Sequence, residues 1–318
     1  MDDKTFAKRI HERFPEGLTG LFAIGGTRTS YILENNRYND EPGKITDFSH
    51  YSQFSLKQYM DIIEAFVTLG GQNMVISALS FRSFFERGPE YADLVTPELG
   101  QLIGEELVSF YRSNHIDPYF VGLDTLLRFS PMTATHQMAK QLIEFQNHWI
   151  YQDQNLKLVW EIASIPLYTF WRFFEESSEA ERAELRGEIE SSDGLEQLQS
   201  RLYHHFCKHA LGFSLPLPHF YVGTCKSGDL KIRSPLMISL TAGEYLRMYY
   251  TPYPSLFMKK DTLKSIIEDL ALNERFHSTN TDYKGQYTPK LAQKEYERIL
   301  TLSANPHSVL GFTRRVSE

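Results

Sequence analysis

A glycine pair followed by hydroxyl and guanidinium side chains is the part of the sequence that most suggests chemistry. An apolar segment, typical of a buried strand, ends in the run Gly25-Gly26-Thr27-Arg28-Thr29. Paired glycines let backbone N–H groups approach an anion, a helix that starts after the turn adds its positive end, and Arg28 can hold phosphate oxygens in a fork. The pattern favours a phosphate-binding turn. The alternative is a tight strand-end turn that carries a surface arginine.

Aromatic side chains also bear on the type of ligand. They make up 14% of the chain, with 18 tyrosines and 22 phenylalanines. Such rings can line an apolar cavity and stabilise a carbocation through their faces. An ordinary place in the core is the alternative at each position, so only the combination with an anion-binding turn is suggestive. The aromatic residues cluster in the segments 51–54, 81–91, 168–174 and 249–253.

Other catalytic schemes lack their local patterns. The sequence contains no G-x-S-x-G, no P-loop and no G-x-G-x-x-G after a strand, which argues against serine hydrolases, nucleoside triphosphatases and dinucleotide-dependent enzymes. Among His204, His205 and His209, two histidines form an i, i+4 pair on a predicted helix. The sequence has no HExxH motif and no convincing third ligand, which argues against a metal cluster there. Nothing near Cys207 or Cys225 marks a thiolate of lowered pKa, so two buried thiols are expected.

Composition places the chain among soluble globular enzymes and binding proteins. With 318 residues, of which 42% are hydrophobic and 23% charged, it can bury a large core. The formal net charge of −7 is spread without a basic block, which argues against a nucleic acid or an acidic lipid surface as partner. Two cysteines without metal-ligand spacing, and an N-terminus without an apolar signal core, predict a cytoplasmic protein without a membrane span.

The elements that position these residues alternate between strand and helix. Short apolar runs take turns with segments of helical spacing, which is typical of an α/β fold with a central, mostly parallel sheet flanked by helices. We expect one domain over residues 1–318, about six strands, and the active cavity near their carboxyl ends. An acidic stretch, 175–200, indicates a helical pair or insertion. The first predicted strand begins at residue 21, and the others cover 74–79, 116–123, 156–163, 219–224 and 235–240. The predicted helices cover 54–69, 96–113 and 133–150.

Five segments, taken in order, resemble one enzyme family nearly from end to end. The chain resembles the cis-prenyltransferase fold, and in particular its diterpene-alcohol branch, the tuberculosinol and kolavelool synthases. The first segment holds a strand followed by Gly-Thr-Arg, and the second resembles an aspartate-Arg-Gly-x-x-Tyr segment. The five are Phe22 to Glu34, Phe84 to Tyr91, Glu106 to Tyr111, Tyr249 to Ser255 and Asn305 to Phe312.

The resemblance implies a diterpene alcohol synthase. Such an enzyme takes a bicyclic C20 allylic diphosphate of kolavenyl or tuberculosinyl type from a separate class II cyclase, ionises the C–O bond, releases pyrophosphate and captures the cation with water. It further implies a homodimer, and Mg²⁺ that neutralises the charge developing on the diphosphate. Two alternatives remain open: a prenyltransferase that joins the cation to an organic acceptor, and a non-catalytic partner subunit.

The resemblance also implies roles for individual residues. Arg28 would stabilise the leaving group and thus be catalytic. Tyr51 and Tyr91 match tyrosines that would face the reacting carbon, steady the allylic cation and position the water. Lys226 stands where the family has a second arginine. The matched diphosphate-binding positions are Gly25, Gly26, Thr27, Arg28, Thr29 and Lys226.

One departure from the family concerns the metal. An aspartate of the family is replaced by Gly25, and an arginine by Thr29. No metal ligand can therefore be named. Magnesium could be held by the diphosphate together with Asp40, Glu41 or Asp47 of the long loop. A solvated loop is the alternative for these acids, and a metal-independent enzyme is the alternative for the reaction.

Overall fold

One parallel sheet organises the protein. The computed structural model describes residues 1–35, 45, 47–81, 92, 95–224, 230, 232–240, 246–254, 257–272 and 289–304. Within these ranges six strands pair in parallel in the order β3-β4-β2-β1-β5-β6, which confirms the predicted α/β architecture. The strands are β1 (Leu18–Ala23), β2 (Gly71–Leu79), β3 (Ile116–Val121), β4 (Leu156–Ile162), β5 (Phe220–Thr224) and β6 (Arg247–Thr251).

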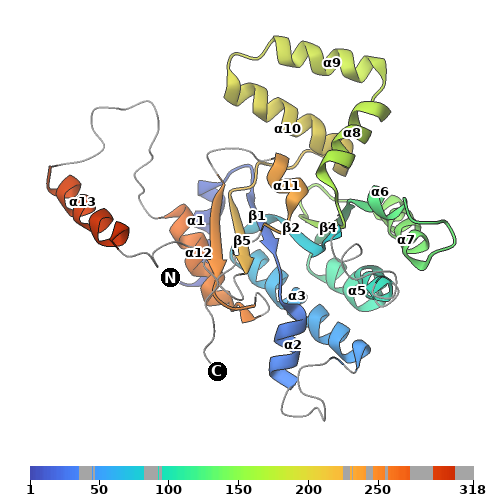
Figure 1. Cartoon of the computed structure of the whole chain (residues 1–318), viewed down its shortest axis with the longest axis horizontal. Helices are drawn as coiled ribbons and strands as arrows, with labels where there is room; N and C mark the ends of the chain where they lie inside the picture. The colour runs from blue at the N-terminus through green and yellow to red at the C-terminus, as the bar shows by residue number, and fades with distance from the viewer. Residues whose placement is uncertain are drawn as a thin grey trace.

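Helices cover both faces of the sheet because side chains alternate along each strand. In β1, Phe22 belongs to one buried cluster, whereas Leu21 and Ala23 belong to the other. Figure 1 shows α8, α9 and α10 above the sheet and α3 below it. The first cluster is closed by α1 (Asp3–Arg13), α3 (Phe48–Thr68), α5 (Glu105–Ser113), α7 (Ala134–His148) and α12 (Lys260–Ala271). The second is closed by α8 (Pro166–Glu176), α9 (Glu179–Glu190), α10 (Leu195–Leu211) and α11 (Pro235–Leu240).

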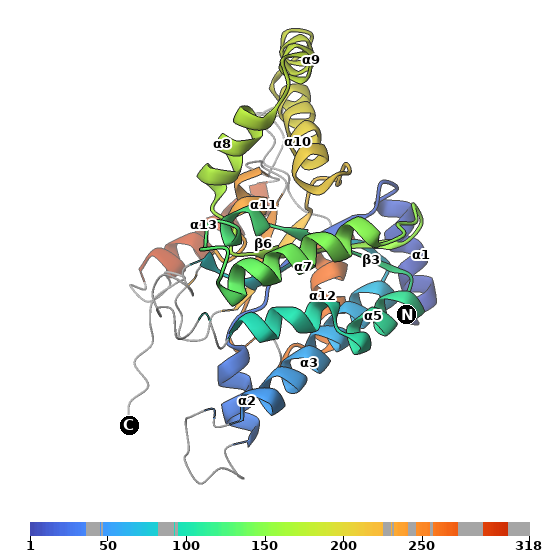
Figure 2. The same cartoon turned by 90° about the vertical axis from the view of Figure 1, so that its right-hand side faces the viewer.

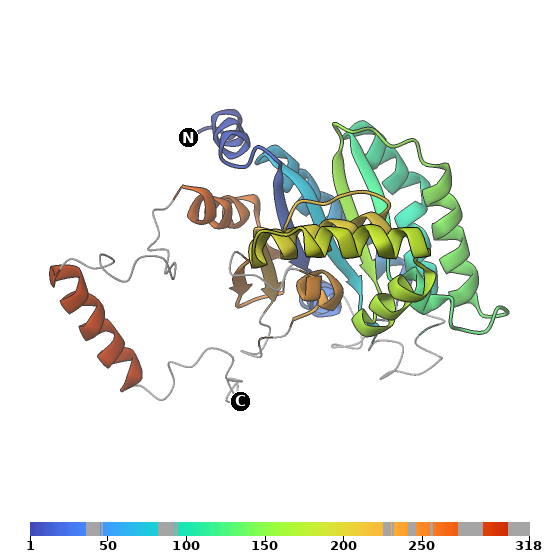
Figure 3. The same cartoon turned by 90° about the horizontal axis from the view of Figure 1, so that it is seen from above.

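The acidic stretch 175–200, for which a helical pair or an insertion was predicted, is largely helical in the structure. Residues 175–200 contain the end of α8, all of α9 and the start of α10, and together these helices project from the sheet (Figure 2). Seen from above, α9 and α10 lie in front of the strands (Figure 3). A capping box starts α9: Glu181 N donates to Ser178 Oγ over 3.2 Å, and Ser178 N donates to Glu181 Oε2 over 2.7 Å.

The strand predicted at 235–240 is wrong, because the structure shows helix α11 there. Pro235 supplies the fixed φ that suits a first helical turn, and Ile238 N donates to Ser234 O over 3.1 Å. A short, mostly apolar run does not by itself distinguish a buried strand from a short buried helix. The last strand is β6 instead, in a segment noted for its aromatic residues and for the family resemblance but not predicted as a strand.

Two predicted helices have different bounds. The helix predicted from residue 54 begins at Phe48, because the side chain of Asp47 accepts a hydrogen bond from His50 N over 3.0 Å and caps the helix. The helix predicted over 96–113 is interrupted: residues 95–100 are helical, η1 (Gln101–Ile103) follows, and α5 starts after an extended Gly104. The remaining helices are α2 (Thr27–Asn35), α6 (Leu123–Leu126) and α13 (Pro289–Ser303). In the described part of the chain, no helix is both long and apolar enough to cross a membrane.

Candidate active site

A cavity of about 370 Å³ lies at the carboxyl ends of the two central strands. Residues 24–29, which follow β1, form one wall, and residues 77–80 at the end of β2 form another. The helix α3 and residues between 95 and 102 complete the lining. Ligands of open parallel sheets bind at this end of the strands, and the active cavity was predicted there.

The glycine turn lies in the wall of this cavity. Gly26 has φ of 79°, a left-handed conformation that favours glycine. Its carbonyl accepts hydrogen bonds from Ser30 N over 2.8 Å and from Ser30 Oγ over 3.2 Å, which starts α2. Thr27, Arg28 and Thr29 therefore occupy the first turn of a helix, where backbone N–H groups lack partners within the helix and negative charge is favoured.

Arg28 offers an unpaired positive charge at this turn. Its side chain lines the cavity and is exposed. It makes no ion pair and no hydrogen bond with the residues that the structure describes. A guanidinium in this state is available to an anionic ligand, which it can hold by two parallel hydrogen bonds.

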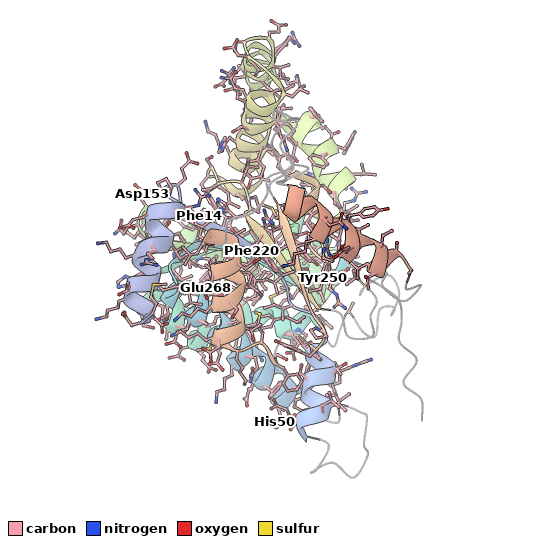
Figure 4. The ribbon with its side chains drawn as sticks, turned by 90° about the vertical axis from the view of Figure 1, so that its left-hand side faces the viewer. Phe14, His50, Asp153, Phe220, Tyr250 and Glu268 are labelled. Carbon is pink, nitrogen blue, oxygen red and sulfur yellow. The ribbon has the colours of Figure 1, made fainter. Side chains whose placement is uncertain are left out.

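Tyr51 is fixed next to the same turn. Its hydroxyl shares a hydrogen bond of 2.7 Å with Thr27 Oγ1, and its ring meets Tyr31 edge-on with ring centroids 5.4 Å apart. Tyr31 is held in turn, since its hydroxyl lies 2.9 Å from Nδ1 of His50. Figure 4 shows His50 at the lower end of the molecule, where α2 and α3 lie together. The structure thus joins Thr27 and Tyr51, two residues predicted to act together.

The deeper part of the cavity is apolar and aromatic. Tyr59 and Trp160 meet edge-on there, with ring centroids 5.6 Å apart. The indole N–H of Trp160 donates to the hydroxyl of Tyr111 over 3.0 Å, so its polar atom is satisfied in the core. The other apolar lining residues are Ile24, Leu56, Ala78, Leu79, Val95, Leu99 and Leu102. A ligand with an anionic head and a hydrocarbon body matches this division.

Two polar side chains line the cavity without a partner. The hydroxyl of Ser55 is buried and makes no hydrogen bond in the described part of the chain. The carboxyl of Glu98 likewise has no hydrogen bond or ion pair to a described residue. Burial raises the pKa of Glu98 to about 7. A buried polar group without a partner is costly, so Ser55 indicates a bound water or a polar ligand atom, and the half-buried Glu98 carboxyl is open to the same partner.

Arg233 supplies a second cation that sequence reasoning missed. It lines the cavity next to Gly25, although it follows β5 and is more than 200 residues away in the chain. Its carbonyl accepts a hydrogen bond from Ser77 Oγ over 2.6 Å, and its N–H donates to the hydroxyl of Tyr221 over 3.2 Å. These bonds fix the backbone of Arg233 between β2 and β5.

A buried carboxylate anchors the segment that carries Arg233. Glu161, in β4, accepts hydrogen bonds from the hydroxyl of Ser234, from Ser164 Oγ over 2.5 Å and from Leu236 N over 3.1 Å. Burial raises the pKa of Glu161, and these donors oppose the rise by stabilising the charged form. Glu161 therefore ties the start of α11 to the centre of the sheet.

Replacing Glu161 with alanine should lower the free energy of unfolding by about 3 kcal/mol or more, because buried donors lose their acceptor at roughly 1–3 kcal/mol each. Urea unfolding followed by circular dichroism measures the loss. The matched control is Glu184→Ala, which removes an exposed carboxylate from α9. Equal stability of the two variants would contradict the anchoring role.

Two solved structures are similar to this architecture. The lavandulyl diphosphate synthase from Lavandula x intermedia, solved in complex with dimethylallyl diphosphate, matches with a TM-score of 0.52 at 13% identity, over 81% of this chain and 97% of that one. A probable undecaprenyl diphosphate synthase from Campylobacter jejuni matches with a TM-score of 0.50 at 14% identity, over 83% and 99%. The chain has the cis-prenyltransferase fold. No family model and no curated protein sequence matches it.

Within the cis-prenyltransferase fold, the structure gathers most of the predicted diphosphate-binding residues. Those that line the cavity are Gly25, Gly26, Thr27, Arg28 and Thr29, together with Tyr51. Tyr91 and Lys226 lie outside the described residues, so their predicted roles remain predictions. Of the aromatic clusters, 51–54 reaches the cavity, whereas Phe170 and Phe173 of 168–174 pack on the opposite face of the sheet.

The described lining offers few protein ligands for magnesium. Glu98 is the one carboxylate among the described lining residues, and the described part of the chain holds no group of three or more acidic, histidine or cysteine side chains suited to a metal. Asp47 is engaged in capping α3, and Asp40 and Glu41 lie outside the described residues. Mg²⁺ usually binds through one or two carboxylates together with substrate phosphates and several waters, and Glu98 is the one carboxylate that the described lining could supply.

Proposed function

We propose that the chain cleaves an allylic prenyl diphosphate and transfers the resulting cation to water. The observation that carries this proposal is the mixed lining of the cavity. Two guanidinium groups, Arg28 and Arg233, line it without an ion pair to any described residue, and apolar and aromatic side chains, interspersed with a few polar ones, line the rest. A ligand with a diphosphate head and a hydrocarbon body matches this mixed lining. The fold supports the proposal, since both similar structures are named as diphosphate synthases.

The chemistry follows from the two ends of the cavity. The allylic C–O bond breaks, and its electron pair leaves with the diphosphate, whose growing negative charge Arg28 stabilises. The aromatic face of Tyr51 offers electrostatic stabilisation to the allylic cation. Water adds to the carbon, and its excess proton goes to a base, which we assign to the Glu98 carboxylate. Ser55 can hold that water, because its hydroxyl is buried without a partner among the described residues.

The finer features of the proposal rest on the sequence resemblance. They are a bicyclic C20 substrate of kolavenyl or tuberculosinyl type, a separate class II cyclase that supplies it, a diterpene alcohol product and a homodimeric assembly. An alternative function is the transfer of the cation to an organic acceptor. The names of the similar structures favour it, since one is a lavandulyl diphosphate synthase solved with dimethylallyl diphosphate.

A substrate panel tests the proposed function. The purified chain is incubated with acyclic and bicyclic C15 and C20 diphosphates, and organic products and released pyrophosphate are measured together. We expect a diterpene alcohol and an equal amount of pyrophosphate from a bicyclic C20 substrate. An adduct that forms only when an acceptor is added would favour the transferase. No turnover by the chain alone, but turnover with an active homologue, would favour the partner-subunit reading.

A further inference from the structure

The space beside Gly25 is occupied by the guanidinium of Arg233. A Cβ built on Gly25 would overlap Cζ and Nη1 of Arg233 and would lie 2.9 Å from its Nε. The backbone of Gly25 is not in the left-handed region, so its conformation does not require glycine. A side chain at this position would therefore force the Arg233 guanidinium to move.

Arg233 holds this place through contacts of its own backbone. Hydrogen bonds to Ser77 and Tyr221 fix residue 233, and the bond from Ser234 to the buried Glu161 fixes the next residue. Its guanidinium makes no ion pair with any carboxylate that the structure describes. A cation on a fixed backbone therefore lies in the cavity wall, next to the first turn of α2 and on the same cavity as Arg28.

A cation at this position has an electrostatic consequence. It repels a metal ion and attracts an anion, and in a partly buried cavity both effects exceed those in water. Guanidinium groups can also bind phosphate oxygens by paired hydrogen bonds without any metal. The lining thus offers the diphosphate two cations of the protein itself, and one carboxylate among the described residues to hold a metal.

We infer that the site binds diphosphate through Arg28 and Arg233 without a metal ion, and that Gly25 serves to leave room for the Arg233 guanidinium. This inference rests on the proposed function, because it takes the ligand to be a diphosphate. In this inference Gly25 is a positioning residue: it has no side chain of its own in the site and acts through the position of Arg233.

Calorimetric titration with inorganic pyrophosphate, in chelator and in excess Mg²⁺, tests the inference without turnover. We expect binding in chelator. Arg233→Met should weaken it roughly tenfold to a hundredfold, the equivalent of one lost charge-assisted hydrogen bond. Gly25→Ala should weaken it similarly, because the added Cβ displaces the guanidinium while every charge remains. Gly187→Ala is the matched control, since its Cβ meets nothing within 4 Å.

The outcomes separate the inference from the proposed function. Binding that requires Mg²⁺ would overturn the metal-free site and leave the proposed function standing. No binding in either buffer would overturn both. Weakening by Arg233→Met with none by Gly25→Ala would overturn the role of Gly25 alone. Thermal unfolding of each variant shows whether it is folded. If Gly25→Ala does not fold, Arg233→Met still tests the site independently.

Discussion

Replacing Arg28 with methionine should lower kcat for diphosphate cleavage by about 10²–10³-fold. In the proposed reaction the charge of the leaving group develops beside this guanidinium, which has no partner among the described residues, and loss of one such preorganised donor costs roughly 2.7–4 kcal/mol of barrier. Methionine keeps much of the length of the side chain and removes the charge and the donors. The measurement is single-turnover release of pyrophosphate at saturating substrate.

Two further variants make this test specific. Arg28→Lys keeps the positive charge but loses the paired donors, and it should recover only part of the rate. Arg9→Met removes an exposed arginine from α1, far from the cavity lining, and should leave the rate unchanged. A rate for Arg28→Met within threefold of the unmodified chain would mean that the diphosphate does not leave from this turn.

Above pH 7, replacing Glu98 with glutamine should slow alcohol formation by about 10²-fold or more, which is the rate contribution typical of general base catalysis. Glutamine has the same shape but cannot accept the proton of the captured water. In the unmodified chain, kcat/KM should fall about tenfold per pH unit below pH 7, because the base is then protonated. The pH profile of Glu98→Gln should lack this acid limb.

The raised pKa of Glu98 makes stability and activity depend on pH in opposite directions. Burial raises the pKa of Glu98 from about 4.5 in the unfolded chain to about 7, so the folded state binds the proton more tightly. Its contribution to stability is therefore present below pH 4.5 and is lost as the pH rises to 7, while activity increases. Glu105→Gln, which changes an exposed carboxylate at the start of α5, is the control for both profiles. An unchanged acid limb in Glu98→Gln would assign the base elsewhere.

Periodicity predicted most of the fold because each strand and helix carries its own local signal. The apolar runs at β2 and β4 are bounded by polar turns. The Asp47 cap was not recognised, and the helix that it starts was therefore predicted to begin at residue 54. The segment 235–240 could not be assigned from its pattern. Its helix is stabilised from outside by Glu161, which lies in a strand 75 residues earlier.

The sequence revealed the contiguous part of the site and not the residues that the fold brings to it. The turn from Gly25 to Thr29 is contiguous and therefore visible in the sequence. Arg233 reaches the turn only because β5 pairs with β1 in the sheet, and no local pattern distinguishes it from a surface arginine. Glu98 looks like an acidic residue in the first turn of a helix, and its raised pKa arises from burial, which spacing does not reveal.

The strand order also sets the sequence in which the site can be completed during synthesis. The first four strands made, β1 to β4, are neighbours in the sheet, whereas β5 joins β1 at the pairing of Gly20 with Phe220. A chain emerging from its N-terminus has thus made Arg28 and the apolar lining long before Arg233 exists. The second cation of the cavity arrives with the closing strands, so we expect tight anion binding by the finished chain and by no N-terminal fragment.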